Sequence, residues 1–222
     1  MYATLTVKAF LWSGLRASAQ IPGKNSGSLA RGNWCTPAPG ATTPSLKWGL
    51  SPAARLHRGA LSFHPETGQA APWCLREIGK NPKIWCHGDI APWNMLTENG
   101  RPTLLVDWEF SGPLDPMVEL SRICWLFCQL HDDDLMELHH LPDAAHRAKQ
   151  VRMVCDGYGL CAPLRHTLLE QILETVICET AHEAIDEGLT FESRGELWGF
   201  AWRTRSLYWI WRNRSLLTEA LQ

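Results

Sequence analysis

A β-hairpin predicted between Met95 and Val106 constrains the fold of this chain more than any other sequence feature. Its two arms are runs of apolar and β-branched residues, joined by a turn that contains Asn99-Gly100. Asn-Gly strongly favours a tight turn between antiparallel strands. Counting outward from the turn, Asn94 and Asp107 fall near the open ends of the arms. Adjacent strands lie about 4.8 Å apart, so we expect these two side chains to be neighbours.

Polar residues before the hairpin have the spacing of a phosphoryl-transfer catalytic loop. His87-Gly88-Asp89 precedes Asn94 in the pattern H-x-D-x-x-x-x-N. An amide oxygen at Asn94 and a carboxylate at Asp107 suit Mg²⁺, which takes one or two protein oxygens together with phosphates and water. Asp89 is placed to accept a proton from a substrate hydroxyl, and His87 is expected to support the loop structurally. The alternative is that these residues only form turns and cap a strand, because Asn and Asp favour turns.

Residues 87–121 resemble the catalytic core of the aminoglycoside phosphotransferase and choline kinase family. Members of that family have a protein-kinase-like fold and phosphorylate hydroxyl groups of small molecules. The resemblance implies that Asp89 is the catalytic base, that Asn94 and Asp107 bind Mg²⁺, and that ATP or another nucleoside triphosphate is the phosphate donor. Glu119-Leu120-Ser121 departs from the family's more usual Asp-Leu-Ala, which affects a supporting hydrogen bond and no primary ligand.

Asp115-Pro116 predicts the start of a helix, with the aspartate as its cap and proline at its first position. Asp115 is therefore counted as a supporting residue of the site. The helix that follows is apolar on nearly every side, as expected of a helix at the centre of a domain. Cys124 and Cys128 lie one turn apart on it with His131 beyond, which raises the alternative of a zinc site. The apolar surroundings favour cysteines that pack as small hydrophobic side chains.

Helices are also predicted on both sides of this core. Ser51-Pro52 begins one of two to three turns, and residues 143–155 and 163–187 form two more. A last helix is predicted over about residues 192–220, with a row of tryptophans that we expect to lie mainly in the core. Between them, residues 131–134 carry three aspartates, which either cap the next helix or attract a cationic substrate.

The N-terminal segment differs in composition from the rest of the chain. Residues 21–49 are rich in Gly, Pro, Ser and Thr and have no sustained period of 2 or 3.6. We therefore predict an irregular segment over 1–50 and a phosphotransferase-like C-terminal lobe over 51–222. The resembling family places a nucleotide-binding lobe before its catalytic loop, and no Gly-rich phosphate loop is recognisable here. The nucleotide-binding residues stay unassigned, and a separate chain is one possible source of that lobe.

The overall charge and hydropathy narrow the range of partners. The formal net charge is −2, which gives no basic footprint for nucleic acid or an anionic membrane. No run of eighteen apolar residues occurs, so no transmembrane helix is expected. Ala17-Ser18-Ala19 resembles a signal-peptidase site, but the preceding apolar run is short and lacks a basic start. We expect a cytoplasmic protein whose eight cysteines are reduced.

These observations together predict an α+β fold with a mostly helical lobe around a short catalytic hairpin. The predicted function is transfer of the γ-phosphate of ATP to a hydroxyl group of a small molecule, which would be an aminoglycoside or another alcohol. The alternative is a catalytically inactive or truncated kinase-fold protein that acts as a binding module or as half of a complex.

Overall fold

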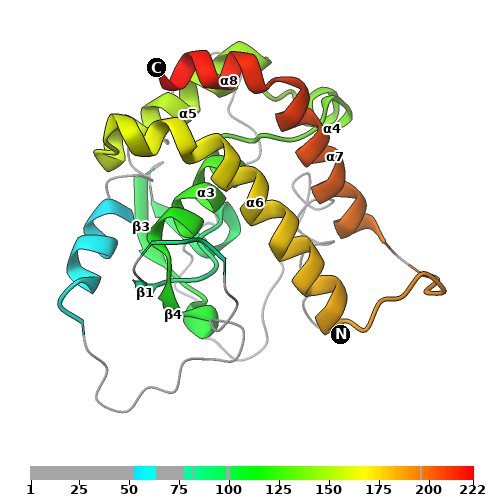
Figure 1. Cartoon of the computed structure of the whole chain (residues 1–222), viewed down its shortest axis with the longest axis horizontal. Helices are drawn as coiled ribbons and strands as arrows, with labels where there is room; N and C mark the ends of the chain where they lie inside the picture. Colours follow the sequence, from blue (N-terminus) through cyan, green and yellow to red (C-terminus); the bar gives the residue numbers. More distant parts are fainter. Residues whose placement is uncertain (1–52, 64–77, 82, 99–100, 196) are drawn as a thin grey trace.

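Short antiparallel strand pairs lie beside a larger set of helices in the computed structural model (Figure 1). The structure describes residues 53–63, 78–81, 83–98, 101–195 and 197–222, so the predicted irregular segment 1–50 lies outside it. The α+β class with a mostly helical lobe is confirmed. A helix over residues 53–60 matches the one predicted after Ser51-Pro52.

The strands form two separate pairs. β1 (Ile84–Cys86) pairs with β4 (Gly112–Leu114), and β2 (Met95–Glu98) pairs with β3 (Arg101–Leu105). The second pair is the predicted hairpin, with a register irregularity between Leu96 and Thr97. Two single-turn 3₁₀ helices, η2 (Pro92–Asn94) and η3 (Trp108–Phe110), flank its open end.

Helix α3 (Pro116–Phe127) is the centre of the helical lobe. It packs against α6 (Ala162–Asp186), and α5 (Ala144–Tyr158) packs against α8 (Arg214–Leu221) (Figure 1). Nearly all of the side chains of α3 are buried, as its apolar sequence predicts. The hydrophobic core of the lobe includes buried residues from several helices: Leu120, Ile123, Trp125, Val151, Val154, Leu168, Ile172, Trp209, Ile210 and Leu217.

The C-terminal part departs from the sequence prediction in two ways. The single helix expected over residues 192–220 is two helices, α7 (Trp198–Arg212) and α8, which meet at Asn213. There the Asn213 side chain donates to the carbonyl of Trp209 at 2.9 Å, a local bond that competes with regular helix geometry. Trp202 and Trp209 are buried as expected, but Trp211 is exposed because it lies on the outer face of α7.

Two further helices are close to their predicted positions. α5 is capped by Asp143 and ends at Gly159, whose φ of 78° suits a left-handed cap. In α6 the apolar stripe buries Leu168, Ile172 and Val176, whereas Ile177 and Ile185, predicted to belong to it, face solvent. No helix among the described residues is long and apolar enough to cross a membrane.

Candidate functional site

The predicted metal ligands Asn94 and Asp107 lie at the open end of the β2–β3 hairpin. Met95 pairs with Leu105, and the amide of Val106 donates to the carbonyl of Asn94 at 2.9 Å. Asp107 therefore lies one residue beyond the residue that is bonded to Asn94. The prediction that these residues flank the hairpin's open end is confirmed, because it depends only on the turn and on strand pairing.

Asn94 connects this end to the Asp89 loop. Its side chain is buried, and Nδ2 donates to both the carbonyl and the Oδ2 of Asp89, at 2.9 and 2.8 Å. Among the described residues no hydrogen bond occupies Asn94 Oδ1. The amide thus orients Asp89 with its nitrogen and leaves its oxygen available to a cation.

Asp107 has a backbone conformation that is uncommon outside glycine. Its φ and ψ are 69° and 59°, and its exposed side chain makes no capping bond to η3. Residues held in this region often lie at functional sites. No hydrogen bond or ion pair to the Asp107 carboxylate occurs within the described part of the chain. Its oxygens and Asn94 Oδ1 are hard donors that fit Mg²⁺.

Arg122 is a charged partner of Asp89 that sequence reasoning missed. From α3 it forms an ion pair with Asp89 and a second one, at 2.5 Å, with Glu179 on α6. Burial raises the pKa of the Asp89 carboxyl, opposed by Arg122 and by the hydrogen bond from Asn94. The guanidinium fixes the direction of the Asp89 carboxylate. The sequence does contain one signal for Arg122, because a lone arginine in a helix that is otherwise apolar requires an acidic partner. Nothing in the sequence indicated that Glu179 is one of its partners.

His87 joins the same loop to the hairpin. It is fully buried, its Nε2–H donates to the Val106 carbonyl at 3.0 Å, and its Nδ1 accepts from the Asp89 amide at 3.2 Å. Its ring packs on Trp108 with 4.5 Å between centroids. Burial lowers the pKa of His87, so the neutral ring persists. These contacts link the Asp89 loop to the hairpin through a single side chain.

Glu119 makes the supporting hydrogen bond that its departure from the family pattern put in question. The fully buried carboxylate accepts from the Gly88 amide at 2.7 Å through Oε1. Its Oε2 meets Nε2 of His57, from the helix over residues 53–60, at 2.5 Å. The extra methylene of glutamate is thus accommodated, and the loop beside Asp89 is anchored to α3. Sequence reasoning gave no signal for His57.

Asp115 caps the start of α3, as the Asp115-Pro116 signal predicts. Oδ1 accepts from the Met117 amide at 2.8 Å, which is the helix cap. Oδ2 accepts from the amides of Lys80 and Asn81 at 2.9 and 2.8 Å. The same buried carboxylate therefore caps α3 and fixes the segment that enters β1.

The aspartates of residues 131–134 are already paired with protein groups. Asp132 caps α4 (Asp133–His139) by accepting from the Leu135 amide at 3.0 Å. Arg205 pairs with Asp132 and Asp134, and Arg212 pairs with Asp133. The helix-cap interpretation is confirmed.

Cys124 and Cys128 are packed as hydrophobic side chains. Both are fully buried, and burial raises the pKa of each thiol well above its usual value. Among the described residues, the side chains that lie close enough together to hold a metal ion are His57, Cys86 and Glu119, and neither Cys124 nor Cys128 belongs to this group. The zinc alternative at Cys124, Cys128 and His131 therefore has no support in the described residues.

Comparison with known proteins assigns a family to this arrangement. The pattern of the phosphotransferase enzyme family matches residues 20–164. That match begins at residue 20, within the segment 1–50 that the sequence predicts to be irregular. Over 202 residues the chain is 35% identical to the trifolitoxin immunity protein of Rhizobium leguminosarum bv. trifolii, covering 90% of this chain and 77% of that protein.

A shorter similarity involves the protein LicA of Haemophilus influenzae. The identity is 38% over 52 residues, which is 23% of this chain and 19% or 15% of the two LicA sequences. No solved structure matches the chain. The resemblance to a phosphotransferase family stated from the motif is confirmed.

Proposed function

The chain belongs to the phosphotransferase enzyme family, and from that premise we propose that it transfers the γ-phosphate of ATP, or of another nucleoside triphosphate, to a hydroxyl group of a small molecule. The observation that carries the proposal is the convergence of Asp89, Asn94 and Asp107 at the open end of one hairpin. Because nucleoside triphosphates are found inside cells, the proposal also places the protein in the cytoplasm.

Each side chain has a distinct task in this proposal. Asn94 Oδ1 and the Asp107 carboxylate would hold Mg²⁺, which supplies charge neutralisation at the phosphate groups. Asp89 orients the acceptor hydroxyl and takes its proton as the oxygen bonds to phosphorus and the bond to the leaving diphosphate breaks. Arg122 and Asn94 hold the Asp89 carboxylate in one direction. Such positioning accounts for much of the catalysis in phosphoryl transfer.

A transfer assay tests the proposal. Full-length protein is incubated with Mg²⁺, γ-labelled ATP and a panel of small alcohols, aminoglycosides, choline, homoserine and sugars. We expect label on at least one acceptor, and a loss of about 10²–10⁴-fold in rate for Asp89→Asn, the range for removal of a general base. Asp107→Ala should abolish transfer by weakening metal binding.

Asp143→Asn is the matched control for the catalytic substitution. Asp143 caps α5, is exposed, and lies outside the Asp89 loop and the hairpin. Asparagine caps a helix about as well as aspartate, so this variant makes the same chemical change and should keep full activity. Equal rates in Asp89→Asn and wild type would refute the assigned role of Asp89.

A second candidate function follows from the relative named as a trifolitoxin immunity protein. The chain would then protect a cell by binding or phosphorylating a toxin, and an inactive phosphotransferase fold would suffice for the binding form. Expression of wild type and Asp89→Asn in a toxin-sensitive strain separates the cases. Protection by both proteins indicates binding, whereas protection by wild type alone indicates catalysis.

A further inference from the structure

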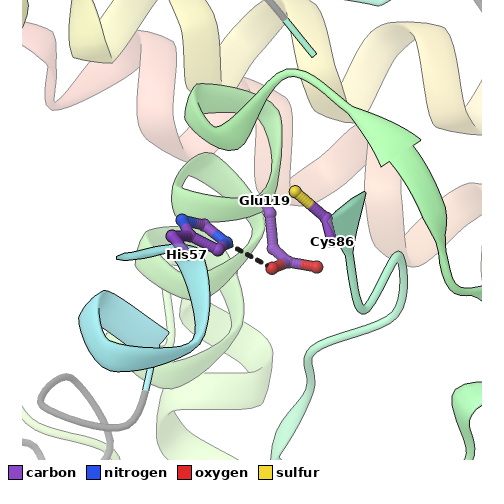
Figure 2. Close-up of side chains that lie close together, drawn as sticks. All are labelled: His57, Cys86 and Glu119. Carbon is purple, nitrogen blue, oxygen red and sulfur yellow. Dashed lines mark hydrogen bonds and ion pairs between the residues drawn. The ribbon is translucent and has the colours of Figure 1, made fainter. Parts of the chain in front are cut away.

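Three potential metal ligands from separate parts of the chain meet behind the Asp89 loop. Figure 2 shows His57 from the helix over residues 53–60, Cys86 at the end of β1 and Glu119 on α3 pointing toward one another. We propose that these side chains form a buried binding site for one thiophilic divalent cation such as Zn²⁺. This site is separate from the proposed magnesium ligands and does not depend on the proposed catalytic activity.

The geometry requires only a small rearrangement, in which His57 and Glu119 move slightly apart and Cys86 moves inward. The three ligand atoms all lie within 4.8 Å of one another, and His57 Nε2 and Glu119 Oε2 are 2.5 Å apart. Tetrahedral Zn²⁺ with ligands at about 2.0–2.3 Å holds them about 3.3–3.8 Å apart. An ion between His57 and Glu119 would replace their direct hydrogen bond and draw Cys86 inward. A water molecule would occupy the fourth coordination position of the ion.

Burial and charge both favour a cation at this point. The three residues are 4%, 0% and 0% exposed in the order His57, Cys86 and Glu119. The ion-pair partner of the buried Glu119 carboxylate within the described residues is His57, a group that is charged only when protonated. One thiolate, one carboxylate and one neutral imidazole around Zn²⁺ give a net charge of zero. A neutral set avoids the large cost of burying an uncompensated charge.

Tyr158 supplies the outer partner that a metal-bound histidine requires. Its hydroxyl lies 2.6 Å from His57 Nδ1, on the side of the ring away from Glu119. Without an ion, Nε2–H donates to Glu119 and Nδ1 accepts from the hydroxyl. On binding, Nε2 ligates through its lone pair, the ring proton resides on Nδ1 and donates to the Tyr158 oxygen, and Cys86 releases its thiol proton to solvent. Such outer hydrogen bonds orient histidine ligands.

The position of the site gives it a structural consequence. The Oε1 atom of Glu119 accepts from the Gly88 amide, next to Asp89 in the sequence. Cys86 precedes His87, which bonds to the hairpin. An ion held by Cys86 and Glu119 would therefore fix the segment that leads into Asp89 and join it to the helix over residues 53–60.

Cobalt provides a direct test because a thiolate ligand produces a near-ultraviolet charge-transfer band. Reduced, chelator-treated full-length protein is titrated with CoCl₂ and then with ZnCl₂. We expect one Co²⁺ per chain, a thiolate band, and its loss when one equivalent of Zn²⁺ displaces the cobalt. Cys86→Ser should remove the band, whereas Cys124→Ser, which changes a buried cysteine outside the cluster, should retain it.

Tyr158→Phe keeps all three ligands and so separates metal binding from folding. Loss of the outer partner should weaken Zn²⁺ binding by about 10–100-fold, measured by competition with a chromophoric chelator. Circular dichroism verifies the fold of each variant. Absence of a stoichiometric thiolate band in wild type, persistence of the band in Cys86→Ser, or unchanged zinc affinity in Tyr158→Phe would overturn the proposal.

Discussion

Removal of the Asp115 carboxylate should destabilise the fold far more than loss of an ordinary helix cap. The side chain is 1% exposed and accepts hydrogen bonds from three backbone amides, those of Lys80, Asn81 and Met117. Hydrogen bonds to charged groups contribute about 1.5–3 kcal/mol each, and a buried donor that loses its acceptor costs about 1–3 kcal/mol. Since the bonds from the Lys80 and Asn81 amides are only partly buried, we expect about 3–5 kcal/mol for Asp115→Ala.

Asp143→Ala is the reference for this prediction. Asp143 also caps a helix, but it is exposed and accepts a single backbone bond, from the His146 amide at 2.7 Å. Loss of such a cap costs about 1 kcal/mol. The two variants therefore differ in the number of amides that lose an acceptor and in burial, while the chemical change is the same.

Urea unfolding followed by circular dichroism measures both variants. With a slope of about 3 kcal/mol/M, the midpoint should fall by about 1–1.7 M in Asp115→Ala and by about 0.3 M in Asp143→Ala. The slope itself should stay constant. Midpoints that coincide for the two variants would show that Asp115 acts only as a helix cap, and would refute its role in fixing the segment before β1.

Two further predictions concern single positions elsewhere. Gly79→Ala should destabilise the protein by about 2–4 kcal/mol, because Gly79 has a φ of 84° and an added Cβ would collide with Asp115 Oδ2. Gly159→Ala is the control, because Gly159 has a similar φ of 78° but open space around it, and it should cost less in the same urea assay. Burial lowers the pKa of His131 to about 3, and its Nδ1 accepts from Trp202 Nε1 at 3.3 Å. Since the unfolded chain binds a proton below about pH 6.5 and the folded ring does not, the free-energy advantage of wild type over His131→Asn should shrink by about 2 kcal/mol from pH 7 to pH 5. A difference in unfolding free energy that is independent of pH would contradict the low pKa.

The features predicted correctly from the sequence are those that local signals determine. Asn99-Gly100 and the flanking runs predict the hairpin, and the hairpin in turn places Asn94 and Asp107 at its open end. Asp115 followed by proline predicts the start of α3 in the same way. Each of these signals lies within a few residues of the structure that it predicts.

The contacts that sequence reasoning missed depend on packing between distant segments. Arg122 meets Glu179 across 57 positions, and His57 meets Glu119 across 62. No local pattern encodes which face of α3 lies against α6 or against the helix over residues 53–60. The division of the last helix at Asn213 was missed for another reason. The apolar pattern of the sequence continues through this position, and only the hydrogen bond from the Asn213 side chain to the Trp209 carbonyl marks the break.

Thermal unfolding with and without saturating MgATP tests the central claim most directly. A nucleotide at a hundred times its dissociation constant adds about 2.7 kcal/mol, and each kcal/mol raises the midpoint by about 2–4 °C for a domain of this size. We predict a rise of about 5–10 °C in wild type and in Asp143→Asn, and none in Asp107→Ala. The absence of any shift in wild type, or an equal shift in Asp107→Ala, would contradict a magnesium-nucleotide site at the open end of the hairpin.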